Sequence, residues 1–149
     1  MMTTRWLPLV CLSLLALTAC EDEEASGELV GPLAGPHVAE SVLALGVFEG
    51  VPDGITDMFV QDETVHLWVR WNRLVPPHTA EAIWYDPSGD DVDVSLVEIL
   101  DGPAEQITVF SLDLTPSSMT GFWEVDLWLD AEFHRSHLFE VVPEIVPGS

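Results

Sequence analysis

The stretch Thr64-Val65-His66-Leu67-Trp68-Val69-Arg70-Trp71 decides the fold class, because its apolar residues recur in steps of two. Successive side chains of an extended strand point to opposite faces, so every second residue from Val65 to Trp71 lies on one apolar face. The stretches from Phe110 to Leu114 and from Trp123 to Leu129 alternate in the same way. These three patterns predict half-buried β-strands.

Further apolar runs follow one another along the chain at intervals of roughly ten residues, which is the spacing of an all-β sandwich or barrel. Pro, Gly, Asp and Asn separate them, and no helical repeat of apolar residues is sustained. We therefore expect an all-β, antiparallel β-sandwich of seven to eight strands. The predicted strands are Val42–Phe48, Ile55–Val60, Thr64–Trp71, Ala80–Asp86, Val92–Ile99, Ile107–Leu114, Phe122–Leu129 and His134–Val142.

Turn-forming residues lie between these strands. Asp86-Pro87-Ser88-Gly89-Asp90 and Asp101-Gly102-Pro103 combine Pro, which fixes φ, with Gly, which permits positive φ. Thr115-Pro116-Ser117-Ser118 is a third turn signal, and Asp130-Ala131-Glu132 is expected to close a tight hairpin.

Several residues give the domain a resemblance to a known fold family. Trp84 lies in the third or fourth strand of the sandwich, and the segment Gly121-Phe122-Trp123-Glu124-Val125 is followed by Phe139-Glu140-Val141. Over about residues 62–142 this arrangement resembles immunoglobulin-like and fibronectin-like domains, and its last part resembles the final hairpin of bacterial surface modules. The resemblance implies a fold and no activity.

The beginning of the chain reads as a secretory signal. A short basic segment is followed by an apolar run from Trp6 to Leu17, which at about twelve residues is too short to cross a bilayer as a helix. The quartet Leu17-Thr18-Ala19-Cys20 resembles the lipobox of bacterial lipoproteins. That resemblance implies lipidation of Cys20, including palmitate-type acyl chains, and cleavage after Ala19, so residues 1–19 are the expected signal peptide. Two acyl chains would hold the protein stably on a membrane.

The segment from residue 20 to residue 37 is expected to be a flexible tether. It opens with Glu-Asp-Glu-Glu after Cys20 and continues with Ala, Ser, Gly and Pro without apolar periodicity. A single domain over residues 38–146 follows, which matches the roughly 100 residues of one β-sandwich. Its only candidate disulfide partners, Cys11 and Cys20, both precede it, so the domain is expected to contain none.

Charge narrows the class of partner. The chain carries 26 acidic residues against four Arg or Lys, for a formal net charge of −22. Such a surface repels phosphate backbones and anionic headgroups, so we expect no nucleic-acid partner. Cations, basic proteins and neutral glycans remain as partners.

We find no motif for catalysis and expect no cofactor. The sequence lacks Gly-x-Ser-x-Gly, His-Glu-x-x-His and a Gly-rich phosphate loop, and 26 acids make chance carboxylate pairs uninformative. His134 and His137 are three apart, so on a regular strand they cannot bind one metal ion. Calcium at the loop with Asp86, Asp90, Asp91 and Asp93 is an alternative, although turn-forming aspartates explain that cluster as well.

Candidate binding residues come from the strand phase. If Trp84 and Trp123 face the core, the outward positions of the same sheet include four large apolar or aromatic residues: Ile83, Tyr85, Trp128 and Leu138. Acidic residues share this face, namely Glu81, Glu124, Asp126 and Glu140. An apolar centre with a charged rim is typical of a recognition surface. A loop or the tether could instead cover it, and Trp68 on another strand is a secondary candidate that the segment 42–60 could cover.

The last strand conflicts with its own pattern. Placing Phe139 and Val141 inward also places Arg135 and His137 inward. A bulge between Ser136 and Phe139, or a strand start beyond the edge of the core, would resolve the conflict.

The sequence thus predicts a lipoprotein of the bacterial cell envelope, anchored in the bilayer through Cys20 and facing the periplasm or the exterior. Its domain is expected to be a non-enzymatic binding or structural module for an envelope protein or glycan. The alternatives are a carrier or sensor of a small ligand or of calcium and, third, an envelope hydrolase.

Overall fold

A computed structural model describes residues 34–145 of the chain. Within that range there is no helix, and hence none that could span a membrane. The range forms nine strands: β1 His37–Phe48, β2 Val51–Ile55, β3 Met58–Val60, β4 Thr64–Asn72, β5 His78–Tyr85, β6 Asp91–Ile99, β7 Gln106–Asp113, β8 Gly121–Leu129 and β9 Glu132–Val142. The signal peptide, Cys20 and most of the tether expected from the sequence lie outside the described residues.

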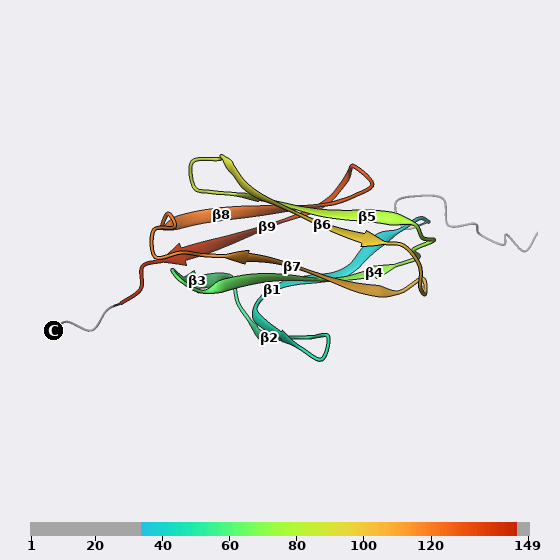
Figure 1. The fold of residues 1–149 in the computed structure, drawn as a ribbon, viewed down its shortest axis with the longest axis horizontal. Coiled ribbons are helices and arrows are strands. Elements are labelled where there is room, and N and C mark those ends of the chain that lie inside the picture. Colours follow the sequence, from blue (N-terminus) through green and yellow to red (C-terminus); the bar gives the residue numbers. More distant parts are fainter. Residues whose placement is uncertain (1–33, 146–149) are drawn as a thin grey trace, which may run out of the picture.

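The strands form two sheets that pack face to face (Figure 1). One sheet has the order β2-β1-β4-β7 and the other the order β3-β9-β8-β5-β6. The segment 34–145 contains both sheets and the core between them, which makes it a complete sandwich. The all-β sandwich expected from the sequence is confirmed.

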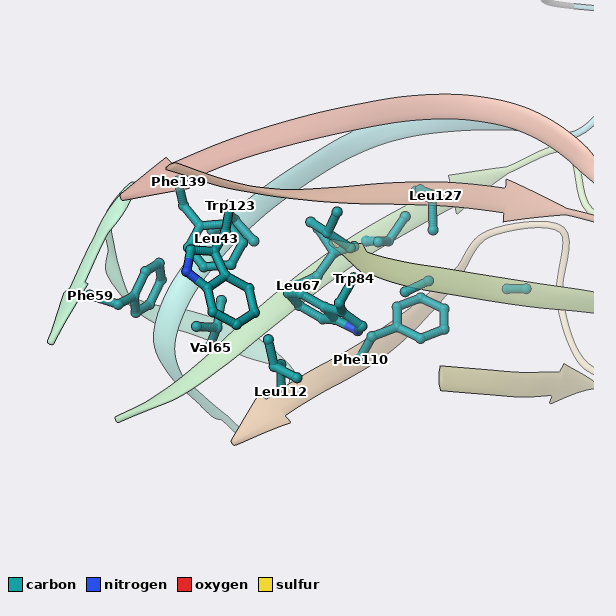
Figure 2. Close-up of a cluster of buried hydrophobic side chains, with 14 of the residues drawn as sticks. Leu43, Phe59, Val65, Leu67, Trp84, Phe110, Leu112, Trp123, Leu127 and Phe139 are labelled. Carbon is teal, nitrogen blue, oxygen red and sulfur yellow. The ribbon is translucent and has the colours of Figure 1, made fainter. Parts of the chain in front are cut away.

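The core consists of the inward residues of both sheets (Figure 2). From the four-stranded sheet, alternate residues of β4 from Val65 to Trp71 are completely buried, as their period predicts. From the five-stranded sheet, Trp84 and Trp123 are buried, and both rings pack against Phe139 at centroid distances of 6.2 and 6.1 Å. The predicted inward phase of these strands is therefore confirmed.

The region between β1 and β4 differs from the expectation. The single strand predicted over Ile55–Val60 is wrong: Ile55 is the last residue of β2, most of which lies before the predicted strand, and Met58–Val60 form β3 in the other sheet. A short turn at Thr56 and Asp57 lets the chain cross between the sheets, and the Thr56 hydroxyl accepts a hydrogen bond from the Met58 amide. β3 then pairs with β9 in parallel, the one exception to antiparallel pairing in the described sheets.

Two turns form where the sequence places them. Asp130 and Ala131 both have positive φ, 49° and 64°, and connect β8 to β9 by a two-residue turn. Between β5 and β6, the Asp86 carboxylate accepts hydrogen bonds from the amides of Ser88 and Asp90. Gly89 has a φ of 83° in this loop, a conformation that favours glycine.

Trp68 is not a surface residue. It points away from the core on β4, but the turn between β1 and β2 covers it, and its Nε1 donates a hydrogen bond to the Gly50 carbonyl at 2.8 Å. The prediction of Trp68 as a secondary binding residue is therefore wrong. The segment 42–60 covers it, which is the alternative expected from the sequence.

The conflict in β9 is resolved by the second solution expected from the sequence, because the strand starts beyond the edge of the core and none of its residues before Phe139 is buried. An irregularity lies near the strand start, where His134 is an extra residue between Phe133, opposite Trp128, and Arg135, opposite Leu127. Arg135 and His137 do face the inner side of the sheet. There they reach the hydroxyl of Ser41 on β1, so the inward polar groups are hydrogen-bonded.

Candidate functional site

The four residues singled out in the sequence lie together on the outward side of the five-stranded sheet. We define the outer face as the outward side chains of β9, β8, β5 and β6. Strand pairing arranges them in rows: Tyr85, Glu124 and Leu138 form one row, Ile83 and Asp126 the next, and Glu81 and Trp128 a third. The outer face therefore mixes apolar and acidic positions, as expected.

The four candidates differ in exposure. Ile83, Tyr85 and Trp128 lie on the central strands β5 and β8 and are half-buried by neighbouring strands. Leu138 on β9 is 64% exposed. A ligand would contact the exposed Leu138 before it reached the half-buried rings of Tyr85 and Trp128 on the central strands.

The structure adds four exposed apolar residues that the sequence reasoning missed: Val94, Leu96, Phe122 and Phe133. Val94 pairs with Ile83 and Leu96 with Glu81, so both extend the rows onto β6. Phe133 pairs with Trp128, and the two rings meet edge to face at 5.5 Å. The apolar part of the outer face is thus wider than four residues.

The signal for two of these residues was present in the sequence. In β6 the residues Val92, Val94 and Leu96 alternate with Asp93 and Ser95, which would ordinarily place the apolar set inward. The structure reverses this, because Asp93 pairs with the inward residue Trp84. The pairing of β6 with β5 turns the apolar residues of β6 outward. Had this pairing been known from the sequence, β6 would have been included in the predicted binding surface.

A depression of about 340 Å³ indents the outer face where β5 and β8 meet the β5–β6 loop. Three carboxylates line it, those of Glu124 and Asp126 on β8 and of Asp86 in the β5–β6 loop, together with the rings of Tyr85 and Phe122. Such a combination suits a cationic group, since carboxylates attract it and an aromatic ring face favours it.

The electrostatics of the depression reflect this crowding of acids. Burial is the main reason why the pKa of Asp126 is raised, and the neighbouring Glu124 adds to the shift. Burial also raises the pKa of the Tyr85 hydroxyl, with further contributions led by Asp126. Ser136 donates a hydrogen bond to Glu124 at 2.6 Å. A bound cation would relieve the mutual repulsion of the carboxylates.

Two polar atoms of the outer face have no hydrogen-bond partner among the described residues. They are Oδ1 of Asp126 and Nε1 of Trp128, and both atoms are buried. A buried donor or acceptor without a partner is unfavourable by about 1–3 kcal/mol. Both atoms belong to the face that the sequence singled out for recognition.

The metal hypotheses receive no geometric support. Across residues 34–145, no three His, Cys, Asp or Glu side chains are grouped so that they could hold a metal ion. In the loop considered for calcium, the Asp86 carboxylate is engaged by backbone amides of its own turn. These hydrogen bonds correspond to the turn-forming role that the sequence offers as the alternative to calcium binding.

Comparison with solved structures places the fold in a class. An immunoglobulin-like protein from Pseudomonas aeruginosa matches 75% of this chain and 100% of its own length, with a TM-score of 0.51 and 14% identity. The C-terminal domain of wzt matches 74% of this chain and 75% of its own, with a TM-score of 0.53 and 9% identity. The domain is therefore an immunoglobulin-like β-sandwich.

The same fold recurs as part of larger proteins. The alkylpurine DNA glycosylase AlkC from Pseudomonas fluorescens matches 71% of this chain, with a TM-score of 0.50 and 11% identity, and the chain covers 30% of that protein. No protein-family model and no curated protein matches the sequence. At these identities the likeness concerns the fold alone, and it supports a binding or structural module in general terms.

Proposed function

We propose that this protein is a lipid-anchored lipoprotein of the bacterial cell envelope whose immunoglobulin-like domain binds another envelope protein through the outer face. The lipobox resemblance at Leu17-Thr18-Ala19-Cys20 supports the anchor. The outer face supports the binding role, and it is the observation on which the proposal depends.

The outer face has the composition of a recognition surface. Leu138 and Phe122 are 64% and 69% exposed, and Trp128 packs against the half-exposed Phe133. Exposed apolar side chains that lie side by side are favoured at interfaces, where aromatic residues often supply most of the binding free energy. The neighbouring four-stranded sheet instead covers its outward tryptophan, Trp68, with its own chain.

The acidic residues define the chemistry of the partner. Glu124, Asp126 and Asp86 surround the depression beside Tyr85, and the chain as a whole carries a net charge of −22. A complementary surface would present a Lys or Arg side chain to the depression and apolar groups to Leu138 and Phe122. The partner we propose is therefore a protein with a basic and apolar patch.

The test compares matched variants on the two sheets. Leu138→Asp places a charge in the outer face, and Ile107→Asp places the same charge on the outward side of β7 in the other sheet, at a residue that is also exposed. Residues 21–149 of each variant are immobilised and exposed to envelope extract, after the thermal transition has been checked.

We expect one captured protein to be retained by the wild type and Ile107→Asp and reduced at least tenfold by Leu138→Asp. Equal capture by both variants would refute a role of the outer face. Capture of a glycan in place of a protein would contradict the proposed class of partner.

A further inference from the structure

A second polar cluster lies at the open edge of the sandwich, on the side of β9 opposite the outer face. β2 pairs with β1 only from Ala44 onward, and β3 pairs with β9 only from Glu140 onward. The first half of β1 and the middle of β9 therefore form an edge that no further strand of the described chain covers. Ser41, Arg135 and His137 meet at this edge.

The three side chains form a directed hydrogen-bond chain. Arg135 Nη1 donates to Ser41 Oγ at 3.1 Å, and Ser41 Oγ lies 2.8 Å from His137 Nε2. A guanidinium can only donate, so Ser41 accepts from Arg135 and its own proton is free to bond the imidazole. Ser41 is only 8% exposed, whereas Arg135 is exposed, so the cluster joins a buried hydroxyl to an accessible guanidinium.

Arg135 has no acidic partner among the described residues. Arg70 has carboxylates of Glu40 and Glu105 within 4 Å, whereas within residues 34–145 no carboxylate lies within 4 Å of Arg135. In the same range Arg73 has no carboxylate within 4 Å either, and its Nη1 donates to the Ala34 carbonyl, so what distinguishes Arg135 is its contact with the buried hydroxyl of Ser41. A guanidinium binds carboxylates with strong, oriented hydrogen bonds.

A depression of about 400 Å³ adjoins the cluster. Ser41 and His137 line it together with the apolar side chains of Leu43, Ile55 and Leu138. Asp57 lies in the same lining and is exposed, so it repels a second negative charge. The depression thus has one polar end with donors, apolar walls and a single acid at its rim.

We propose that this edge binds a monocarboxylate with an apolar chain of medium length. Its carboxylate would contact Ser41 and His137, and its chain would lie against Leu43, Ile55 and Leu138. The exposed guanidinium of Arg135 is not part of the lining, but it contacts Ser41 and would reach the carboxylate from the rim. One guanidinium matches one negative charge. A doubly charged anion would face Asp57 and the net charge of the whole chain without a second cation to balance it.

Binding of such an anion should be coupled to protonation of His137. Burial, and then the nearby Arg135, lower the pKa of His137, so its charged form is disfavoured in the free protein. Asp57 lines the same depression, while β8 contributes Val125 opposite His137. Glu40 of β1 is engaged by Arg70. A bound carboxylate would raise the pKa of His137, and its affinity should therefore increase as the pH falls toward the lowered pKa of His137 in the free protein.

The test uses octanoate as the probe and residues 21–149, which include the complete sandwich. Octylammonium has the same chain with the opposite charge, and acetate has the same head group without the chain. We expect octanoate to shift the NMR resonances of Ser41, His137 and Leu138 saturably, and to raise the titration midpoint of His137 but not that of His66. Octylammonium and acetate should do neither below 10-fold higher concentration.

A matched pair of variants separates the site from bulk charge. Arg135→Gln should weaken octanoate binding at least tenfold, which corresponds to about 1.4 kcal/mol, since the variant loses a charge-assisted hydrogen bond to the carboxylate. Arg73→Gln removes the same charge from the loop after β4 and should change the affinity less than twofold. Equal loss in both variants, equal binding of octylammonium, or no saturable shift would overturn the proposal. Leu138 lines both depressions, so Leu138→Asp alters both sites. Arg135→Gln separates the two proposals, because Arg135 faces the inner side of the sheet and its replacement should leave capture of the outer-face partner unchanged.

Discussion

The rings of Trp128 and Phe133 meet edge to face on the outer face, with centroids 5.5 Å apart. On the opposite side of β8, Trp123 stacks on Phe139 in the core and is only 5% exposed. The same two strands thus carry one aromatic pair for stability and one within reach of a partner.

Replacing the two tryptophans should separate these roles. Trp123→Ala removes a buried ring whose Nε1 also donates to the Met119 carbonyl, and we expect it to destabilise the fold by about 3–5 kcal/mol. Trp128→Ala removes a half-buried ring and one aromatic contact, and we expect a loss of about 1–2 kcal/mol. Urea denaturation measures both. Equal losses would mean that Trp128 belongs to the core and would contradict its role at an interface.

A buried hydrogen bond between β4 and β7 offers a second test. Trp71 Nε1 donates to Thr108 Oγ1 at 2.9 Å, and both residues are buried. Thr108→Val keeps the shape but leaves the indole N–H without an acceptor, which should lower the free energy of unfolding by about 1–3 kcal/mol. The control is Thr64→Val, which breaks an exposed hydrogen bond to Asp113 and should change stability by less than about 0.5 kcal/mol.

Stability should fall on mild acidification. Burial is the main cause that lowers the pKa of both His134 and His137. The unfolded chain binds these protons near the ordinary value of 6.5, whereas the folded chain binds them only at lower pH. Between these values the unfolded state holds more protons. The free energy of unfolding should therefore decrease as the pH falls below about 6.5 and level off below the folded pKa values.

Urea midpoints at pH 7.5 and 5.5 measure this effect. His137→Gln should reduce the difference between the two midpoints, because Gln can still bond Ser41 but does not titrate. If the wild-type midpoint is the same at both pH values, the burial of the two imidazoles contributes nothing measurable.

The anchor gives a prediction for residues outside the described structure. We expect Cys20→Ser to move the protein from the membrane to the soluble fraction, because two acyl chains are needed for stable attachment. Intact mass of the wild-type protein should show a diacylglyceryl group on a chain that begins at Cys20. An unmodified chain in the membrane fraction would contradict the lipobox interpretation.

Most of the sandwich could be predicted because period-2 alternation and turn residues coincide in β4, β7 and β8. The division of residues 55–60 into β2 and β3 could not, since it depends on a change of sheet at Thr56 and Asp57 that a short apolar run does not record. The parallel pairing of β3 with β9 depends on residues more than 80 positions apart. Such pairing leaves no local signal.

The candidate site was predicted in part for a similar reason. Ile83, Tyr85, Trp128 and Leu138 follow from the phases of β5, β8 and β9, which the core tryptophans fix. Phe133 was not predicted, because the extra residue His134 changes the inward–outward alternation at the start of β9. Ser41 and His137 are 96 positions apart in the sequence, so their contact follows only from the packing of the two sheets.

The pairing of β3 with β9 also constrains the order in which the chain can fold. Phe59 is completely buried, and its ring packs edge to face against Phe139 of the last strand at 5.6 Å. During synthesis or export from the N-terminus, residues 58–60 therefore remain exposed to solvent until residues 139–142 are present to pair with them. The five-stranded sheet closes late, and until then its apolar strands are exposed to chaperones, proteases and aggregation.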